Sequence, residues 1–191
     1  MSTRLTLAST SPQRRAILEQ LRIPFEVVVP TYVEDDPPGR EPAELVRLHA
    51  EGKARSVHGA GRLTLGVDTE VVLDGRVYGK PSDRADAARM LDELSGRTHT
   101  VVSGLCLLGA GVDVVTNDVT EVTMRSFSRF AVGAYLESGE WEGRAGSYAI
   151  QGLGGRLVQR IEGDYLNVVG LPGALLVSLL ERHAPNLLET A

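Results

Sequence analysis

The chain has 191 residues, of which 42% are hydrophobic and 24% are charged, and its formal net charge is −5. This composition is typical of a globular protein and predicts one compact domain over residues 1–191. The acidic balance and the 5% of aromatic residues argue against nucleic acid as a partner, because binding it needs a basic face and rings for base stacking.

Two further features of the composition concern the compartment. The first ten residues lack the apolar core of a secretory signal, and no apolar run approaches the roughly 18 residues needed to span a bilayer. Cys106 is the only cysteine and lies in an apolar stretch, so we expect a buried structural thiol and no internal disulfide. These observations predict a cytoplasmic protein without membrane contact.

The chain begins with the pattern of a strand, a turn and a helix. Apolar residues predict a strand at Arg4–Ala8, and their helical spacing predicts a helix at Pro12–Leu21. A proline can occupy the first turn of a helix, so the hydroxyls of Ser9 and Ser11 and the free amides of that turn would face a ligand, with Arg14 nearby. This turn is predicted to bind an anion, most plausibly phosphate.

The rest of the chain is predicted to alternate between strands and helices. Strands are expected at Phe25–Pro30, Leu63–Val67, Glu70–Leu73, Arg76–Tyr78, Thr98–Leu108, Leu157–Ile161 and Leu166–Val169, with further antiparallel strands between Val112 and Phe127. Helices are expected at about Ala43–Val57, at Arg84–Leu94 capped by Ser82, at Arg129–Glu137 capped by Ser128, and from Gly170-Leu171-Pro172 to His183. Asp74-Gly75 is the strongest hairpin signal. The order of elements predicts a mixed α/β fold with hairpins and excludes a regular Rossmann array.

Polar residues from several separate segments could act together on a polyphosphate. The hydroxyls and cations are those of Ser9, Ser11, Arg14, Lys53 and Lys80, and the carboxylates are those of Glu34, Asp35, Asp36 and Asp68. A polyphosphate with a divalent ion needs both kinds of group. Alternatively, each cation is a solvated surface charge, and the acidic run at 34–36 is a solvated face.

Two of these residues are placed by their neighbours. Asp68 follows a strand of the buried type, so we expect its carboxylate at a strand's end, where α/β sheets present ligand-facing groups; the alternative is an Asp that caps a turn. Lys80 lies between Gly79 and Pro81, on a stiff turn that would aim its ammonium group.

Missing motifs narrow the class of reaction. The sequence contains no P-loop, no G-x-G-x-x-G, no G-x-S-x-G and no H-E-x-x-H. A P-loop kinase, a dinucleotide oxidoreductase, a serine esterase and a zinc protease are therefore poorly supported. The four histidines are scattered along the chain and are expected to fill the core or the surface.

Several blocks in order resemble the Maf family of nucleoside triphosphate pyrophosphatases. They are LASTSPQRR at Leu7–Arg15, VDT at Val67–Thr69, GKP at Gly79–Pro81, LSGRTH at Leu94–His99, AGSYAIQG at Ala145–Gly152 and GDYLNVVGLP at Gly163–Pro172. The resemblance covers nearly the whole chain. It implies a mixed twisted sheet with flanking helices, two lobes around a central cleft, and hydrolysis of a nucleoside triphosphate between its α and β phosphates.

The resemblance also implies roles for individual residues. Asp68 would accept the proton of the attacking water, and Glu34 would assist with metal or water. Phosphates would be bound by Ser9, Ser11, Arg14, Lys53 and Lys80. A divalent metal, Mg²⁺ or Mn²⁺, is the expected cofactor, with Glu34 and Asp68 as its ligands, and a homodimer is plausible.

Base preference divides the family into a group that acts on dTTP and UTP and a group that acts on 7-methyl-GTP. Thr69 and Gln151 match the first group, and an amide such as Gln151 can pair with the carbonyl and N–H edge of a pyrimidine. Gln13 departs from both groups, and Arg144 replaces the usual Lys of the first. The resemblance therefore predicts hydrolysis of dTTP and UTP, with other or modified pyrimidine triphosphates accepted as well.

Besides hydrolysis of 7-methyl-GTP, the activity of the second group of the family, two other functions remain open at the level of sequence. One is a house-cleaning pyrophosphatase for deaminated purine nucleotides such as ITP and XTP. The other is a nucleotide-binding regulator of cell division without important catalysis, against which the presence of Asp68 argues.

Overall fold

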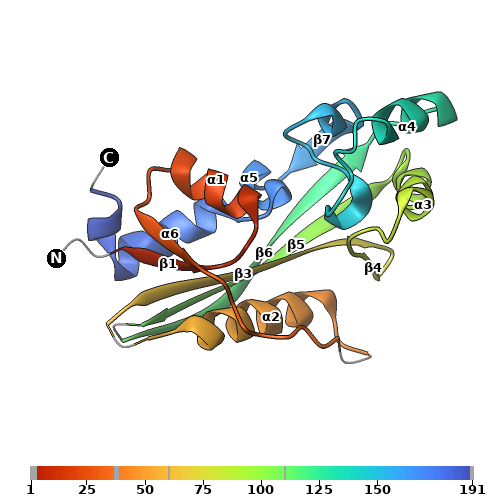
Figure 1. The fold of residues 1–191 in the computed structure, drawn as a ribbon. Coiled ribbons are helices and arrows are strands. Elements are labelled where there is room, and N and C mark those ends of the chain that lie inside the picture. Colours follow the sequence, from red (N-terminus) through yellow and green to blue (C-terminus); the bar gives the residue numbers. More distant parts are fainter. Residues whose placement is uncertain (1–3, 37–38, 60, 110, 190–191) are drawn as a thin grey trace. The chain divides into compact units, whose positions relative to one another are not determined.

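The computed structural model describes residues 4–36, 39–59, 61–109 and 111–189, and its helices and strands are labelled in Figure 1. The strands are β1 (Leu5–Ala8), β2 (Phe25–Val28), β3 (Leu63–Leu73), β4 (Arg76–Tyr78), β5 (Thr98–Gly109), β6 (Val112–Met124) and β7 (Val158–Glu162). The helices are α1 (Pro12–Gln20), α2 (Pro42–Val57), α3 (Arg84–Leu94), α4 (Arg129–Leu136), α5 (Tyr165–Val169) and α6 (Gly173–His183), with short 3-10 turns η1 (Ala145–Ser147), η2 (Leu153–Arg156) and η3 (Pro185–Leu187).

The strands within these residues form one mixed sheet. Its order is β2-β1-β3-β5-β6-β7, and β4 pairs with β3. Strand β1 is parallel to β2 and to β3, whereas β4 is antiparallel to β3 and β7 is antiparallel to β6. The prediction of a mixed α/β fold with flanking helices is therefore confirmed.

The chain divides into two compact units. The first contains the described residues of Met1–Thr69, Ser103–Asp118 and Gly170–Ala191, and the second those of Glu70–Val102 and Val119–Val169. Strands β3, β5 and β6 each contribute residues to both units.

In the first unit, glycines bring a helix against the strands. A Cβ atom on Gly66 of β3 would lie 2.0 Å from the carbonyl oxygen of Ala50, and one on Gly104 of β5 would lie 2.1 Å from that of Val46. Only glycine therefore allows α2 this close to the strands, and Figure 1 shows α2 on one side of them with α1 and α6 on the other. Cys106 is buried against this helix, and burial raises the pKa of its thiol to about 12, so the predicted structural thiol is confirmed as buried.

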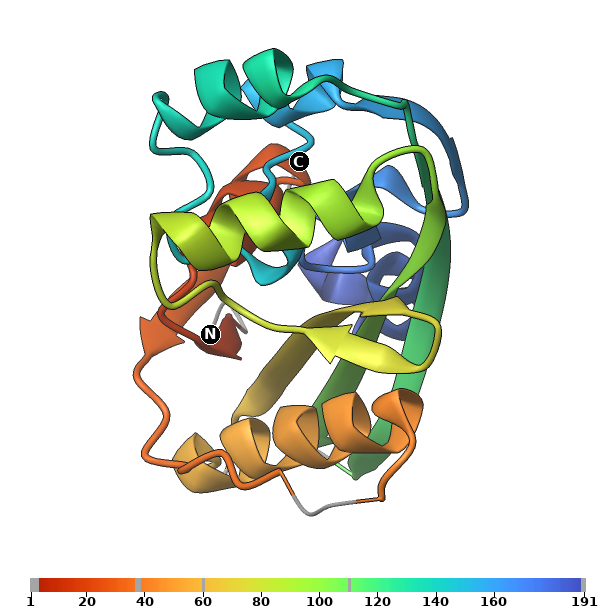
Figure 2. The same ribbon diagram turned by 90° about the vertical axis from the view of Figure 1, so that its right-hand side faces the viewer.

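The second unit has its own apolar core. Its members come from strands, helices and the segments on either side of η2, and include Val71, Tyr78, Leu91, Leu94, Val101, Val122, Met124, Tyr135, Tyr148 and Leu157. Helix α3 contacts α4 and η1, and in Figure 2 it lies between α4 and β4 of the same unit. The hairpin at Asp74-Gly75 is confirmed, because both residues have positive φ, as a type I′ turn requires.

Some element predictions are wrong. Leu166–Val169 is part of helix α5 and not a strand, because the Asp164 carboxylate accepts the backbone N–H of Leu166 and starts a helical turn. The side chain that caps α3 is Asp83, since Ser82 instead donates its N–H and its hydroxyl to Asp86. The expected strands between Val112 and Phe127 form one strand, β6, which ends at Met124 where its register with β7 shifts.

Strand β3 also differs from the prediction. It runs without interruption from Leu63 to Leu73, so Asp68 lies within the strand and not at its end. The strand continues because its first part pairs with β1 up to Gly66 and its last part pairs with β4 from Val71. Asp68 and Thr69 lie between these two paired parts.

Candidate active site

The turn between β1 and α1 is organised by its own serines. The parallel register ends with Ala8 opposite Gly66, two residues before Asp68 in β3. Ser9, which is buried, then accepts the backbone N–H of Ser11 at 3.1 Å. Ser11 is the N-cap of α1 and accepts the backbone N–H of Arg14 at 3.4 Å, as the position of Pro12 in the first turn predicts.

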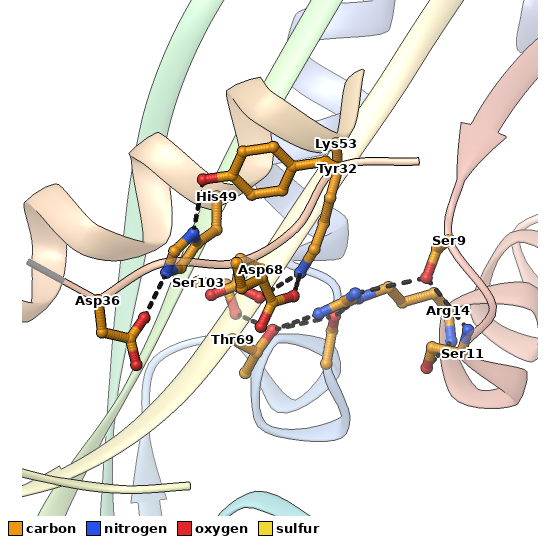
Figure 3. A network of polar contacts seen from close by, with 12 residues as sticks. Ser9, Ser11, Arg14, Tyr32, Asp36, His49, Lys53, Asp68, Thr69 and Ser103 are labelled. Carbon is orange, nitrogen blue, oxygen red and sulfur yellow. Dashed lines mark hydrogen bonds and ion pairs between the residues drawn. The ribbon is translucent and has the colours of Figure 1, made fainter. Parts of the chain in front are cut away.

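Arg14 connects this turn to two distant parts of the first unit. Its Nη1 donates to the Ser9 hydroxyl at 3.4 Å, its Nη2 donates to Thr69 Oγ1 at 3.2 Å, and its Nε donates to the Gly170 carbonyl at 3.0 Å. The guanidinium therefore has a fixed plane next to β3 (Figure 3). A planar, fixed guanidinium is suited to bind phosphate oxygens.

Beside Arg14, Lys53 of α2 holds two carboxylates together. Its Nζ lies 2.6 Å from Asp68 Oδ1 and 2.6 Å from Glu34 Oε1. The side chains of Lys53 and Asp68 are only 11% and 9% exposed, whereas that of Glu34 is 53% exposed. Asp68 Oδ2, the other carboxylate oxygen, is buried, and no group of the described residues donates to it. Such an oxygen in a buried charged cluster is a candidate for chemistry, because structural ion pairs are normally fully hydrogen-bonded.

The acidic loop after β2 is attached to α2 by a second contact. His49, which is buried, donates from Nε2 to the Asp36 carboxylate at 2.9 Å and accepts the Tyr32 hydroxyl at Nδ1 at 3.0 Å, as Figure 3 shows. Burial, followed by the nearby carboxylates of Glu34 and others, raises the pKa of Tyr32. Tyr32 is therefore a neutral hydrogen-bonding group at physiological pH.

The carboxylates fit a divalent ion of the magnesium type. The described residues contain no group of three or more His, Cys, Asp or Glu side chains placed to hold a metal. Mg²⁺, however, commonly uses one or two carboxylates together with substrate phosphates and water. Asp68, with its unpartnered oxygen, and Glu34, which reaches the same lysine, are suited to that arrangement.

The structure brings most of the predicted site residues together in the first unit. Ser9, Ser11, Arg14 and Thr69 form one hydrogen-bonded network, and Lys53, Glu34 and Asp68 form the adjoining ion-paired group. Gln13 lies on α1, where its Oε1 accepts the hydroxyl of Ser11. Lys80 and Gln151 are exposed residues of the second unit, in the segment after β4 and between η1 and η2.

Four residues of these networks were not identified from the sequence. Ser103 and Gly170 contact Thr69, and Tyr32 and His49 fix the acidic loop. Ser103 is an isolated hydroxyl within an apolar strand. His49 lies on a helix, and the sequence does not show that the acidic loop packs against this helix. The hydrogen-bonding partners of these residues lie far along the chain, so spacing alone carries no signal for them.

Comparison with known proteins gives a consistent result. The profile of the family described as Maf-like protein matches residues 4–183. A protein of Nitratidesulfovibrio vulgaris named dTTP/UTP pyrophosphatase is 48% identical over 93% of this chain and 86% of its own length. Proteins of the same name from Gloeobacter violaceus and Symbiobacterium thermophilum are each 46% identical, over 94% and 92% of this chain and 96% and 92% of their own lengths.

The similarity to solved structures is more distant. A HAM1 protein from Coxiella burnetii is 18% identical, with a TM-score of 0.44 over 66% of this chain and 75% of its own. Separately, no helix in the described part of the chain has the length and apolar character needed to cross a membrane.

Proposed function

We propose that this chain, which belongs to the Maf family, hydrolyses dTTP and UTP to the nucleoside monophosphate and pyrophosphate. The names of relatives at 46–48% identity support this substrate class. The proposal rests on the proximity of the fixed Arg14 guanidinium to the buried ion pair of Lys53 and Asp68. Arg14 donates to Thr69, which is adjacent to Asp68 in β3. Cationic groups for phosphates and a carboxylate for water thus occupy one part of the first unit.

In the proposed reaction, Asp68 accepts a proton from the water that attacks the α-phosphorus. Its Oδ2 has no donor among the described residues and can therefore orient that water, while Lys53 holds Oδ1. Arg14 and Lys53 offset the charge that builds on the phosphoryl oxygens, and pyrophosphate leaves. Ser9, Ser11 and Lys80 are proposed as further phosphate ligands, and Gln13 and Gln151 as contacts to the base.

A divalent ion, Mg²⁺ or Mn²⁺, is proposed as the cofactor. Asp68 and Glu34 would hold it, and when bound it would neutralise charge on the phosphate oxygens. We further propose that the protein acts in the cytoplasm, where nucleoside triphosphates are abundant.

A nucleotide panel tests the function. Purified protein is assayed with Mg²⁺ or Mn²⁺ for pyrophosphate release from dTTP, UTP, CTP, 7-methyl-GTP, ITP and XTP. We expect turnover to be fastest with dTTP and UTP. Preferential turnover of 7-methyl-GTP, ITP or XTP would assign the chain to one of the alternative substrate classes, and binding without turnover would favour a regulator.

The Asp68→Asn variant tests the assigned base. It keeps the shape of the side chain but removes its basicity, so we expect kcat to fall by roughly 100- to 10,000-fold while UTP still binds. Asp92→Asn is the matched control, because Asp92 is an exposed residue of the second unit. Unchanged turnover by Asp68→Asn would remove Asp68 from its role.

A further inference from the structure

The hydroxyl of Thr69 stands at the centre of the network around Arg14. Thr69 Oγ1 lies 3.2 Å from Arg14 Nη2, 2.9 Å from Ser103 Oγ and 3.2 Å from the Gly170 carbonyl oxygen. Figure 3 shows Arg14 and Ser103 approaching Thr69 from separate segments. Every one of these partners belongs to the first unit.

The direction of each hydrogen bond follows from the chemistry of the partners. A hydroxyl has one hydrogen to donate and two lone pairs that accept. A carbonyl oxygen only accepts, so the hydrogen of Thr69 goes to Gly170, and a guanidinium only donates, so Arg14 takes one lone pair. Ser103 must then donate its hydrogen to the second lone pair. The Thr69 hydroxyl has no capacity left for a ligand.

The same partners determine the position of Arg14. The Gly170 carbonyl accepts from Arg14 Nε as well as from Thr69, so both of its lone pairs are used. Ser103 is 0% exposed and cannot touch a substrate, but its hydroxyl fixes that of Thr69. Loss of either hydroxyl would remove or misorient the acceptor of this hydrogen bond from Arg14 Nη2.

We propose that Thr69 and Ser103 are positioning residues that hold Arg14 for the phosphate chain, and that Thr69 does not recognise the base. This assigns a role to Ser103 and gives Thr69 a different role from the base selectivity that its resemblance to the dTTP/UTP group suggests. The inference rests on the proposed binding of a nucleoside triphosphate.

A ligand without a base separates the two roles of Thr69. Binding of inorganic triphosphate and of a UTP analogue with an imido bridge between the α and β phosphorus atoms is measured by calorimetry. The variants are Thr69→Val, which is isosteric but lacks the hydroxyl, Thr69→Ser, which keeps it, and Ser103→Ala. Arg14→Lys reports whether the arginine binds phosphate, and Thr100→Val removes a strand hydroxyl that donates to a backbone carbonyl of the second unit.

We expect Thr69→Val to weaken binding of both ligands by the same factor, about 10-fold, because a hydrogen bond to a charged group is lost. Ser103→Ala should weaken both equally but less, Thr69→Ser should restore binding, and Thr100→Val should change neither. The ratio of kcat/KM for UTP over CTP should stay constant in all of them.

The proposal is overturned if Thr69→Val weakens the UTP analogue but not triphosphate, or if it changes the ratio of UTP to CTP turnover. It is also overturned if Arg14→Lys leaves triphosphate binding intact. Thermal unfolding is recorded for each variant, and Ser103→Ala decides the question if Thr69→Val does not fold. A wild-type protein that binds triphosphate but hydrolyses no nucleotide would refute the proposed function and leave this inference standing.

Discussion

At the scale of single residues, Lys53 is a charged side chain that is costly to bury. It is an ammonium group at 11% exposure between two carboxylates, one of them nearly buried. Placing charges away from water is unfavourable, and it is offset only while the partners remain together. The conformational stability of the protein should therefore depend on this pair.

Replacing Lys53 by Met tests that dependence. The change leaves the buried carboxylate of Asp68 unpaired, so we expect the free energy of unfolding to fall by about 3 kcal/mol in urea denaturation. The double variant Lys53→Met/Asp68→Asn should recover part of the loss, because the unpaired charge is gone. As a control, Arg15→Met breaks a pair with Glu19 whose side chains are 64% and 55% exposed, and should cost under about 1 kcal/mol. Equal losses in the two single variants would contradict the argument.

Residue patterns identified local parts of the site better than distant ones. Pro12 in the first turn of α1 follows from spacing within one turn of helix, and the structure confirms it. The contact of Arg14 with Gly170 joins residues 156 positions apart, and nothing in the local pattern of either residue specifies it. The buried hydroxyl of Ser103 was missed for the same reason.

At the scale of elements, the acidic loop and α2 form one assembly. Tyr32, Glu34 and Asp36 alternate along the loop, and each contacts His49 or Lys53, which lie one turn apart on the helix. The ring of Tyr32 lies directly over Gly52, where a Cβ atom would approach it to 2.3 Å. The absence of a side chain at Gly52 is thus what allows the loop to reach α2 and present Glu34.

Gly52→Ala should separate loop docking from overall stability. The added methyl group displaces the Tyr32 ring, so hydrogen exchange of residues 31–36 should accelerate. Alanine also favours helix by about 1 kcal/mol, which offsets part of the overpacking, and the unfolding free energy should therefore change by only about 1 kcal/mol. Gly133→Ala in α4 is the control, because its Cβ would meet nothing within 4 Å, and it should stabilise the protein without faster exchange in the loop. Unchanged exchange of the loop in Gly52→Ala would refute this account.

The strands and helices themselves were largely predictable, and the errors have a physical cause. Periodicity located α3 and α4, and the Asp74-Gly75 turn signal located the hairpin, because these patterns are local. Leu166–Val169 is apolar enough for a strand, yet Asn167 is buried in a helical turn, where its Nδ2 donates to Val101 and Thr120. The local structure there therefore depends on the turn that Asp164 starts and on contacts of Asn167 with distant segments.

At the scale of the whole molecule, the local sequence patterns do not show which strands pair with each other in the sheet. The order β2-β1-β3-β5-β6-β7 follows from pairings between segments far apart in the chain. The sequence predicted the strands but not that β3 is uninterrupted. Asp68 and Thr69 lie in β3 between the part that pairs with β1 and the part that pairs with β4. The prediction that Asp68 follows a buried strand segment was therefore correct, whereas the prediction that it lies at the end of the strand was wrong.

The stability of the molecule against acid should depend on His99. This residue is 2% exposed, its Nε2 pairs with Tyr148, and burial lowers its pKa from 6.5 to about 4. Above pH 6.5 the ring is neutral in both states and contributes no pH dependence. Between pH 6.5 and 4 the unfolded chain binds a proton that the folded protein does not, so the folded state loses stability as the pH falls.

The shift predicts a loss of about 3 kcal/mol over that range, of which roughly 2 kcal/mol appears by pH 5. Urea denaturation at pH 7 and at pH 5 measures it. His99→Gln, which cannot titrate, should remove most of this difference even if it lowers stability at both pH values, since only the slope reports the proton. His183→Gln, on the exposed side of α6, should keep the slope of the wild type. If His99→Gln and the wild type lose the same stability between pH 7 and pH 5, the acid sensitivity arises elsewhere and the buried imidazole is not its source.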